Sequence, residues 1–239
     1  PTDTGPGPDR APGPRPVAVP ADIRSLLRAF AEVRIAGMPP LRLAPGEPWQ
    51  EPDPELHRML GGDGTYWPLA RVSLGNHSVS LAHVRIDPES GEWGHVFSVS
   101  AAPDRLGDEP ELVLLAESLP ALLLKVAAIA ADAAGRAAHT GADPAALIRS
   151  ATTWLTPNTG EPWTRPVPVE EWADEQDALR ARAAAFPPGS HAADLRDSPV
   201  PTDLCFYRVW SWTTGHRLDR LHFLDGGRVV VAAARAADA

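Results

Sequence analysis

Cysteine and lysine are almost absent from this chain of 239 residues. Cys205 is the only cysteine, so the chain can form neither an internal disulfide nor a zinc site built from cysteine thiolates. Lys125 is the only lysine, and acidic residues outnumber basic ones by 31 to 22, which gives a formal net charge of −9. A nucleic-acid-binding protein would carry a basic stripe instead. The charge therefore argues against nucleic acid as a partner and suits attraction of a basic partner.

Long apolar runs are also missing. The most apolar segment, from Leu119 to Ala131, contains Lys125 and is shorter than the roughly 20 residues that a membrane-spanning helix needs. Residues 1–20 contain seven prolines and three glycines, with no apolar core of the kind found in a signal peptide. With so little to bury, this segment is predicted to be a disordered tail. We therefore expect a cytoplasmic protein that does not bind membranes.

The stretch from Val79 to Ile129 carries the clearest structural pattern. Apolar and polar residues alternate over 79–86 and again over 93–100, which is typical of two half-buried strands. The polar segment 87–92 between them predicts a hairpin turn. With Ile86 opposite Trp93, one face of this hairpin is predicted to carry Ala82, Val84, Ile86, Trp93, His95, Phe97 and Val99.

A helix is predicted soon after this hairpin. Residues 112–116 are a short apolar run, long enough for a buried strand, and Ser118 follows them. The Ser118 hydroxyl can accept hydrogen bonds from free backbone N–H groups, and Pro120 lies in the first turn, where no donor is needed. We expect the helix that begins there to cover the apolar face of the hairpin, including Trp93 and Phe97.

The remaining segments predict further elements around this centre. Helices are predicted by apolar spacing and capping residues over 22–33, 143–155 and 169–186. Strands are predicted by alternation over 66–74, 204–212, 217–224 and 228–234. Because Asp225-Gly226-Gly227 is a strong hairpin signal, the last three strands are predicted to form a meander.

An internal similarity suggests a duplication. Residues 46–54 begin Gly-Glu-Pro-Trp, and residues 160–168 repeat the segment with six identities at matched positions. Each copy follows an expected helix and precedes expected strands. Residues 22–100 and 143–234 can therefore be interpreted as two copies of one unit, or the similarity is chance in a proline-rich chain.

Together these patterns predict an α+β fold with a mostly antiparallel, twisted sheet backed by helices. Three parts are expected: a proline-rich tail over 1–20, an α+β unit over 21–140, and a remainder over 141–239. The remainder is either a second α+β unit or an extension of the first. If the duplication is real, each unit contains a helix and three strands.

A set of short motifs lies between residues 62 and 130: Trp67-Pro68-Leu69, Arg85-Ile86-Asp87-Pro88, Gly91, Gly94-His95-Val96, and Leu115-Ala116-Glu117-Ser118-Leu119 with Leu122-Leu123. This set resembles the SUKH superfamily, which contains bacterial toxin-immunity proteins and relatives of a yeast cell-wall-assembly regulator. The resemblance implies a twisted sheet backed by helices, and a protein that binds another protein rather than an enzyme. The chain departs from the family at Met38-Pro39-Pro40-Leu41, where the family has Leu-Pro followed by acidic and aromatic residues. Residues from 143 on lie outside the family's usual single domain.

Catalytic motifs do not accompany this resemblance in the sequence. His77, His83 and His95 are near one another along the hairpin, but the predicted register places His83 and His95 on opposite faces. There they cannot share an ion unless the strand contains a bulge. Cys205 is expected to be a buried, inert thiol, and no Gly-x-Ser-x-Gly elbow occurs. We predict no catalytic residues, no metal site and no cofactor.

Acidic residues are concentrated in two loops, one at the hairpin turn and one before residue 112. If the two loops meet, they form an acidic rim that would attract a basic protein such as a nuclease toxin. The alternative is that these acids are scattered over the surface of an acidic protein. The predicted partner-binding residues are Asp87, Glu89, Glu92, Asp104, Asp108 and Glu109.

Three functional hypotheses follow. The first is a non-enzymatic protein-binding protein of SUKH type, with an immunity protein that neutralises a toxin as its specific form. The second is a small hydrolase or ligand-binding enzyme that uses His77, His83 or His95 with nearby acids. The third is a structural adaptor whose two units bridge two partners. The sequence does not indicate an oligomeric state.

Overall fold

The computed structural model describes residues 21, 24–25, 32–38, 40–42, 60, 66–73, 79–87, 90–101, 111–151, 163–172, 177–204, 206 and 218–234. The predicted tail over 1–20, the first copy of the repeated segment and Cys205 lie outside these residues. The described elements form two mostly antiparallel sheets together with helices, so the predicted α+β class is confirmed.

The larger sheet has six strands. Across the sheet their order is β3 (Tyr66–Ser73), β4 (Val79–Ile86), β5 (Trp93–Ala101), β6 (Glu111–Ala116), β10 (Thr202–Leu204) and β7 (Trp163–Thr164). The first four strands are sequence neighbours and pair antiparallel, as their alternating patterns predict. The last two come from later in the chain: β10 pairs antiparallel with β6, and β7 runs parallel to β10.

The smaller sheet has four antiparallel strands in the order β11 (Leu218–Leu224), β12 (Val229–Ala234), β9 (His191–Asp194) and β8 (Val167–Pro168). The 3-10 turn η3 (Asp225–Gly227) joins β11 to β12, which confirms the hairpin predicted from the Asp-Gly-Gly sequence. A separate two-stranded hairpin, β1 (Glu32–Val33) with β2 (Leu41–Arg42), accompanies the sheets.

The long helix α3 (Leu119–Thr140) begins where the sequence predicts. The Ala121 N–H donates to the Ser118 hydroxyl oxygen at 3.2 Å, which caps the first turn. The helix continues through Gly135 and ends at Gly141, whose left-handed φ of 69° suits glycine. The shorter helices are α4 (Pro144–Ala151), the 3-10 helix η2 (Val169–Trp172) and α5 (Ala178–Ala184).

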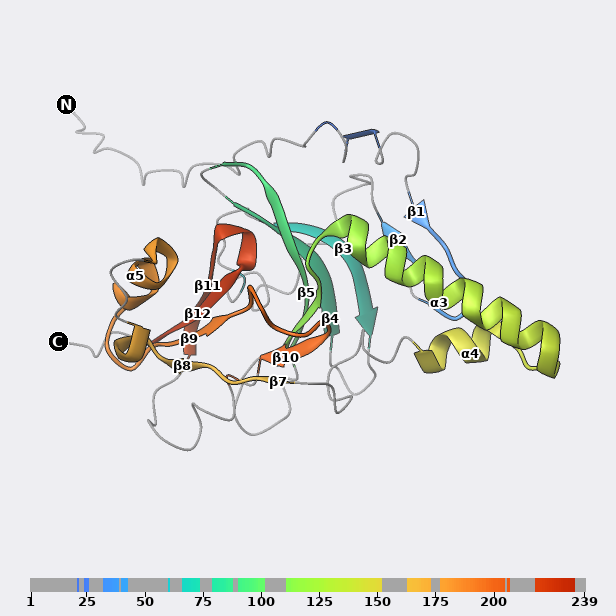
Figure 1. Ribbon diagram of the computed structural model, residues 1–239. Coiled ribbons are helices and arrows are strands. Elements are labelled where there is room, and N and C mark those ends of the chain that lie inside the picture. The colour runs from blue at the N-terminus through green and yellow to red at the C-terminus, as the bar shows by residue number, and fades with distance from the viewer. Residues whose placement is uncertain are drawn as a thin grey trace, which may run out of the picture.

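Three apolar cores hold these elements in four layers. The core between the two sheets contains side chains from both, among them Phe97 and Phe223. On the other face of the six-stranded sheet, Val84 and Val96 pack against α3. The outer face of the four-stranded sheet packs against η2 and α5 through Trp172. Figure 1 shows α3 and α5 on opposite sides of the paired sheets.

A bulge in β5 corrects the predicted faces of the hairpin. Ile86 pairs with Trp93 as predicted, but Val84 pairs with Val96, so β5 contains one more residue than β4 between these pairs. Ala82, Val84 and Trp93 therefore pack on the α3 side, as predicted. Beyond the bulge, Phe97 and Val99 face the four-stranded sheet instead. The expectation that α3 covers Phe97 is wrong, because the extra residue reverses the alternation.

Other boundaries also differ from the predictions. Val33, placed in the first helix, lies in β1, and Gly37 turns the chain into β2. The strand predicted from Leu204 onwards ends at that residue, since β10 comprises Thr202–Leu204. Within the range 169–186, the described residues form two short helices, η2 and α5.

Of the predicted C-terminal meander, the last two strands are confirmed as β11 and β12, whereas most of the first strand, 204–212, lies outside the described residues; Leu204 itself belongs to β10 in the six-stranded sheet. The duplication is not confirmed, and the division of the chain at residue 140 stays a prediction.

The turn η3 touches β5 closely at the bulge, with Gly226 against the backbone of Gly94 and Gly227 against the Phe97 ring. A Cβ atom added to Gly94 would overlap the carbonyl oxygen of Gly226, and one added to Gly227 would come within 2.6 Å of the Phe97 ring. Gly226 and Gly227 also have positive φ values of 61° and 94°, which glycine adopts without strain. Glycine at these positions therefore permits the two sheets to meet at this end.

The variant Gly94→Ala tests this contact. We expect its free energy of unfolding in urea to fall by about 1–3 kcal/mol, because the new methyl group meets backbone that cannot rotate away. The matched control is Gly135→Ala in α3, where nothing lies within 4 Å of the added Cβ. That variant should be neutral or more stable by about 0.5–1 kcal/mol. Equal stability changes in the two variants would show that the contact is not constrained.

Candidate functional site

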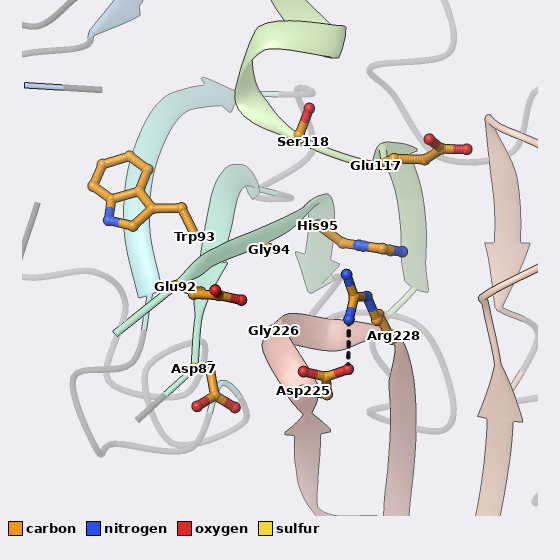
Figure 2. A pocket seen from close by; sticks show the side chains of 10 residues that line it. All are labelled: Asp87, Glu92, Trp93, Gly94, His95, Glu117, Ser118, Asp225, Gly226 and Arg228. Atoms are coloured by element: carbon orange, nitrogen blue, oxygen red, sulfur yellow. Dashed lines mark hydrogen bonds and ion pairs between the residues drawn. The ribbon is translucent and has the colours of Figure 1, made fainter. Parts of the chain in front are cut away.

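A pocket of about 200 Å³ lies at the end of the sandwich where η3 meets β5. We call it the His95 pocket. Three segments distant in sequence form it: the β4–β5 turn with the start of β5, the junction of β6 and α3, and η3 with the start of β12. Its lining residues, drawn in Figure 2, are Asp87, Glu92, Trp93, Gly94, His95, Glu117, Ser118, Asp225, Gly226 and Arg228.

The hairpin turn that supplies Asp87 and Glu92 is held by its own hydrogen bonds. The Asp87 carboxylate accepts from the Ser90 N–H at 2.7 Å and from the Ser90 hydroxyl at 3.1 Å. The Asp87 N–H donates to the Glu92 carbonyl at 2.9 Å, and the Gly91 N–H donates to the Asp87 carbonyl at 2.8 Å. Asp87 is 7% exposed, whereas the Glu92 side chain is exposed. Asp87 thus shapes the turn, and Glu92 presents the accessible charge.

The junction of β6 and α3 adds another acid. Glu117 is exposed and immediately precedes the cap residue Ser118. Backbone N–H groups at a helix N-terminus carry partial positive charge, which stabilises a nearby carboxylate. The N-terminus of the 22-residue helix therefore places partial positive charge next to Glu117 at this edge of the pocket.

The third segment contributes an ion pair. An Arg228 guanidinium N–H donates to the Asp225 carboxylate at 2.9 Å, and both side chains are partly exposed. Asp225 therefore neutralises the positive charge of Arg228, which lines the pocket. Figure 2 shows Arg228 between the ring of His95 and Asp225.

His95 is a buried titratable side chain of the pocket, with the same 7% exposure as Asp87. Burial lowers the pKa of the imidazole from its usual 6.5, and the Arg228 charge lowers it further. Glu117 and Asp225 oppose this effect by favouring the charged form. In the described part of the chain, neither ring nitrogen of His95 makes a hydrogen bond. The neutral ring therefore offers one donor and one acceptor to the pocket.

Beneath the pocket lies a buried layer that includes His83 and Arg85. The ring of His83 stacks with that of Phe97 at a centroid distance of 6.0 Å. The ring of His95 also stacks with that of Phe97, at a centroid distance of 6.3 Å. His83 and His95 therefore share a face of the sheet, which corrects the prediction of opposite faces. The bulge brings this about, and both imidazoles lie near the Phe97 ring.

Arg85 connects this layer to the second sheet. It is 2% exposed, its guanidinium carbon lies 3.9 Å from the Phe223 ring centroid, and a guanidinium N–H donates to the Leu60 carbonyl at 3.1 Å. A cation over an aromatic face is stabilised electrostatically where water is excluded. Arg85 therefore has a structural function between the sheets.

The six predicted partner-binding acids are only partly placed. Asp87 and Glu92 lie together at the His95 pocket. The other four, Glu89, Asp104, Asp108 and Glu109, lie outside the described residues, so whether the two acidic loops meet stays a prediction. Sequence reasoning missed the acids Glu117 and Asp225 as members of the pocket. Glu117 belongs to the motifs that resemble the SUKH superfamily. Asp225, in contrast, reaches the pocket only because η3 contacts β5.

No group of three or more histidine, cysteine, aspartate or glutamate side chains is arranged within the described residues to hold a metal ion. No helix in that part of the chain has the length and apolarity required to cross a membrane.

No protein-family model matches this chain, and neither a curated protein nor a solved structure matches it. The resemblance to the SUKH superfamily therefore stays a prediction.

The buried His83 predicts a pH dependence of stability. Burial and the neighbouring Arg85 lower its pKa from 6.5 to about 3 in the folded chain. The unfolded chain therefore binds the proton more readily, so stability falls as the pH drops below about 6.5. From pH 7.5 to pH 5 this one group should cost about 2 kcal/mol.

The measurement compares urea unfolding of the wild type with that of His83→Phe at both pH values. The wild type should lose about 2 kcal/mol more than the variant, because phenylalanine cannot take up a proton. An equal loss in the two proteins would mean that His83 is not buried in its neutral form.

Proposed function

We propose that this chain is a non-enzymatic, protein-binding protein of SUKH type whose pocket end receives a basic protein. The specific form implied by the resemblance is an immunity protein that binds and neutralises a toxin. The observation that carries the proposal is the convergence of four carboxylates, from three separate segments, on the His95 pocket.

The charge balance of the pocket supports a basic partner. Four carboxylates and one guanidinium line it, and that guanidinium is already paired with Asp225. Within the described residues, the side chains of Glu92 and Glu117 form no hydrogen bond or ion pair. Their negative potential is therefore directed outward, where it would accelerate association with a positively charged surface.

The rigidity of the site supports binding as well. The Asp87–Ser90 hydrogen bonds fix the turn, Ser118 fixes the start of α3, and the Gly94–Gly226 contact fixes η3 against β5. Groups that are already held in place lose little conformational freedom when a partner docks. The acids are thus arranged before the partner arrives.

The hydrolase hypothesis finds less support in the geometry. His83 has no exposed surface and cannot touch a substrate, and His77 lies outside the described residues. Of the two described histidines, His83 and His95, only His95 lines the pocket. We therefore propose binding as the function and treat enzymatic activity as the alternative.

The proposal is tested with the proteins encoded next to this gene. Each is produced separately and titrated against the full chain by calorimetry at low salt. We expect one basic neighbour to bind, with affinity that decreases as salt is added. Glu117→Lys should weaken this binding by about tenfold or more, because it places a cation where the partner's positive surface docks.

The matched control is Glu171→Lys, which makes the same charge change at an exposed glutamate of η2, on the far layer of the sandwich. It should leave the affinity within about twofold of the wild type. The proposal fails if no neighbour binds, or if Glu117→Lys and Glu171→Lys weaken binding equally.

A further inference from the structure

The His95 pocket contains a feature that an acidic surface patch does not explain. His95 is more than nine-tenths buried, it makes no hydrogen bond within the described residues, and its ring points into the pocket (Figure 2). Its ring nitrogens are not among the fully buried side-chain atoms that lack a hydrogen bond, so they are open to the pocket, where a ligand group can replace a water molecule. His95 therefore marks a place for a hydrogen-bonding group inside the pocket.

The size of the pocket limits what that group can be. Its volume is about 200 Å³, which is below the roughly 300–1,000 Å³ of pockets that enclose drug-sized ligands. A single side chain of a partner protein suits this volume better than a free metabolite does.

The charged side chains that line the pocket determine whether it favours a positive or a negative group. The lining carries four carboxylates, and the one guanidinium among them is occupied by Asp225 at 2.9 Å. An anion at the same place would meet Glu92 and Glu117 as like charges. A cation would meet two carboxylates that have no other partner within the described residues.

Hydrogen-bonding geometry distinguishes the two cationic side chains. A guanidinium carries five N–H donors in a rigid plane, so it can donate to an imidazole nitrogen and to a carboxylate at once. It is also more weakly hydrated than an ammonium group, so less favourable hydration is lost when it enters a confined site. Arginine therefore suits the combination of His95 and Glu117 better than lysine.

We infer that the His95 pocket receives one arginine side chain of the basic partner, with the His95 ring as hydrogen-bond acceptor and Glu117 as counter-ion. This inference rests on the proposed function, because it names the group of the partner that enters the site. It also assigns His95 a binding function that the acids alone would not require.

The test uses three short peptides, acetyl-Gly-X-Gly-amide with X as arginine, lysine or citrulline. Each is titrated into the ¹⁵N-labelled full chain and followed by NMR. We expect saturable shifts from the arginine peptide at millimolar concentration, centred on the amide signals of His95, Glu117 and Arg228. Lysine should bind more weakly, and citrulline, which has nearly the same shape without the charge, should cause no saturable shift.

Variants of His95 show whether the arginine peptide needs a hydrogen-bond acceptor at this position or only a side chain of similar shape. His95→Phe keeps a ring beside Phe97 but has no acceptor, so it should weaken binding of the arginine peptide about fivefold or more. His95→Gln retains an acceptor oxygen and should bind within about twofold of the wild type. The control is His139→Gln, at an exposed position in the last turn of α3, which should bind as the wild type does.

Three outcomes would overturn the inference: equal shifts from the arginine and citrulline peptides, unchanged affinity in His95→Phe, or binding of inorganic phosphate at the pocket in place of arginine. Urea unfolding of each variant confirms that it is folded under the conditions of the titration.

Failure of this inference and failure of the proposed function are distinguishable. If a neighbouring protein binds in a Glu117-dependent way but the arginine peptide does not, only the arginine assignment is wrong. If the peptide binds at His95 but no neighbouring protein does, the pocket assignment stands and the proposed partner class falls.

Discussion

The close approach of Gly94 and Gly226 is the constraint on which this end of the molecule depends. It brings the turn of one sheet onto the bulge of the other with no side chain between them. The same bulge turns Phe97 towards the second sheet, where it meets Phe223 at a centroid distance of 5.2 Å. One extra residue in β5 thus determines both how the sheets pack and where the His95 pocket forms.

The core beneath the pocket is unusually polar for the space between two sheets. His83 and Arg85 have almost no exposed surface, and the Nε2 atom of His83 has no hydrogen-bond partner among the described residues. Aromatic rings, including those of Phe97 and Phe223, surround these groups in place of water. Because a buried cation is costly unless it is well contacted, this layer tolerates little rearrangement.

The sequence predicts the local part of this structure well. The strands β4 and β5, the cap at Ser118 and the turn at Asp225 all depend on residues close to one another in the chain. The bulge has one local signal in the sequence, because a glycine inside a strand, here Gly94, often marks a bulge. The pairing of β10 with β6 had none, because short strands from distant segments are selected only by tertiary packing.

The candidate site divides in the same way. Asp87 and Glu92 belong to one turn, so their proximity follows from the hairpin alone, whereas Asp225 joins them only through a contact between sheets. Several carboxylates held at one end of an acidic chain repel one another, which destabilises the fold. The Arg228 ion pair and the N-terminus of α3 offset part of that repulsion, but Glu92 and Glu117 have no pairing of their own within the described residues. A bound cation would remove the remaining repulsion between these carboxylates. The relief of that repulsion would then contribute to the free energy of binding a basic partner.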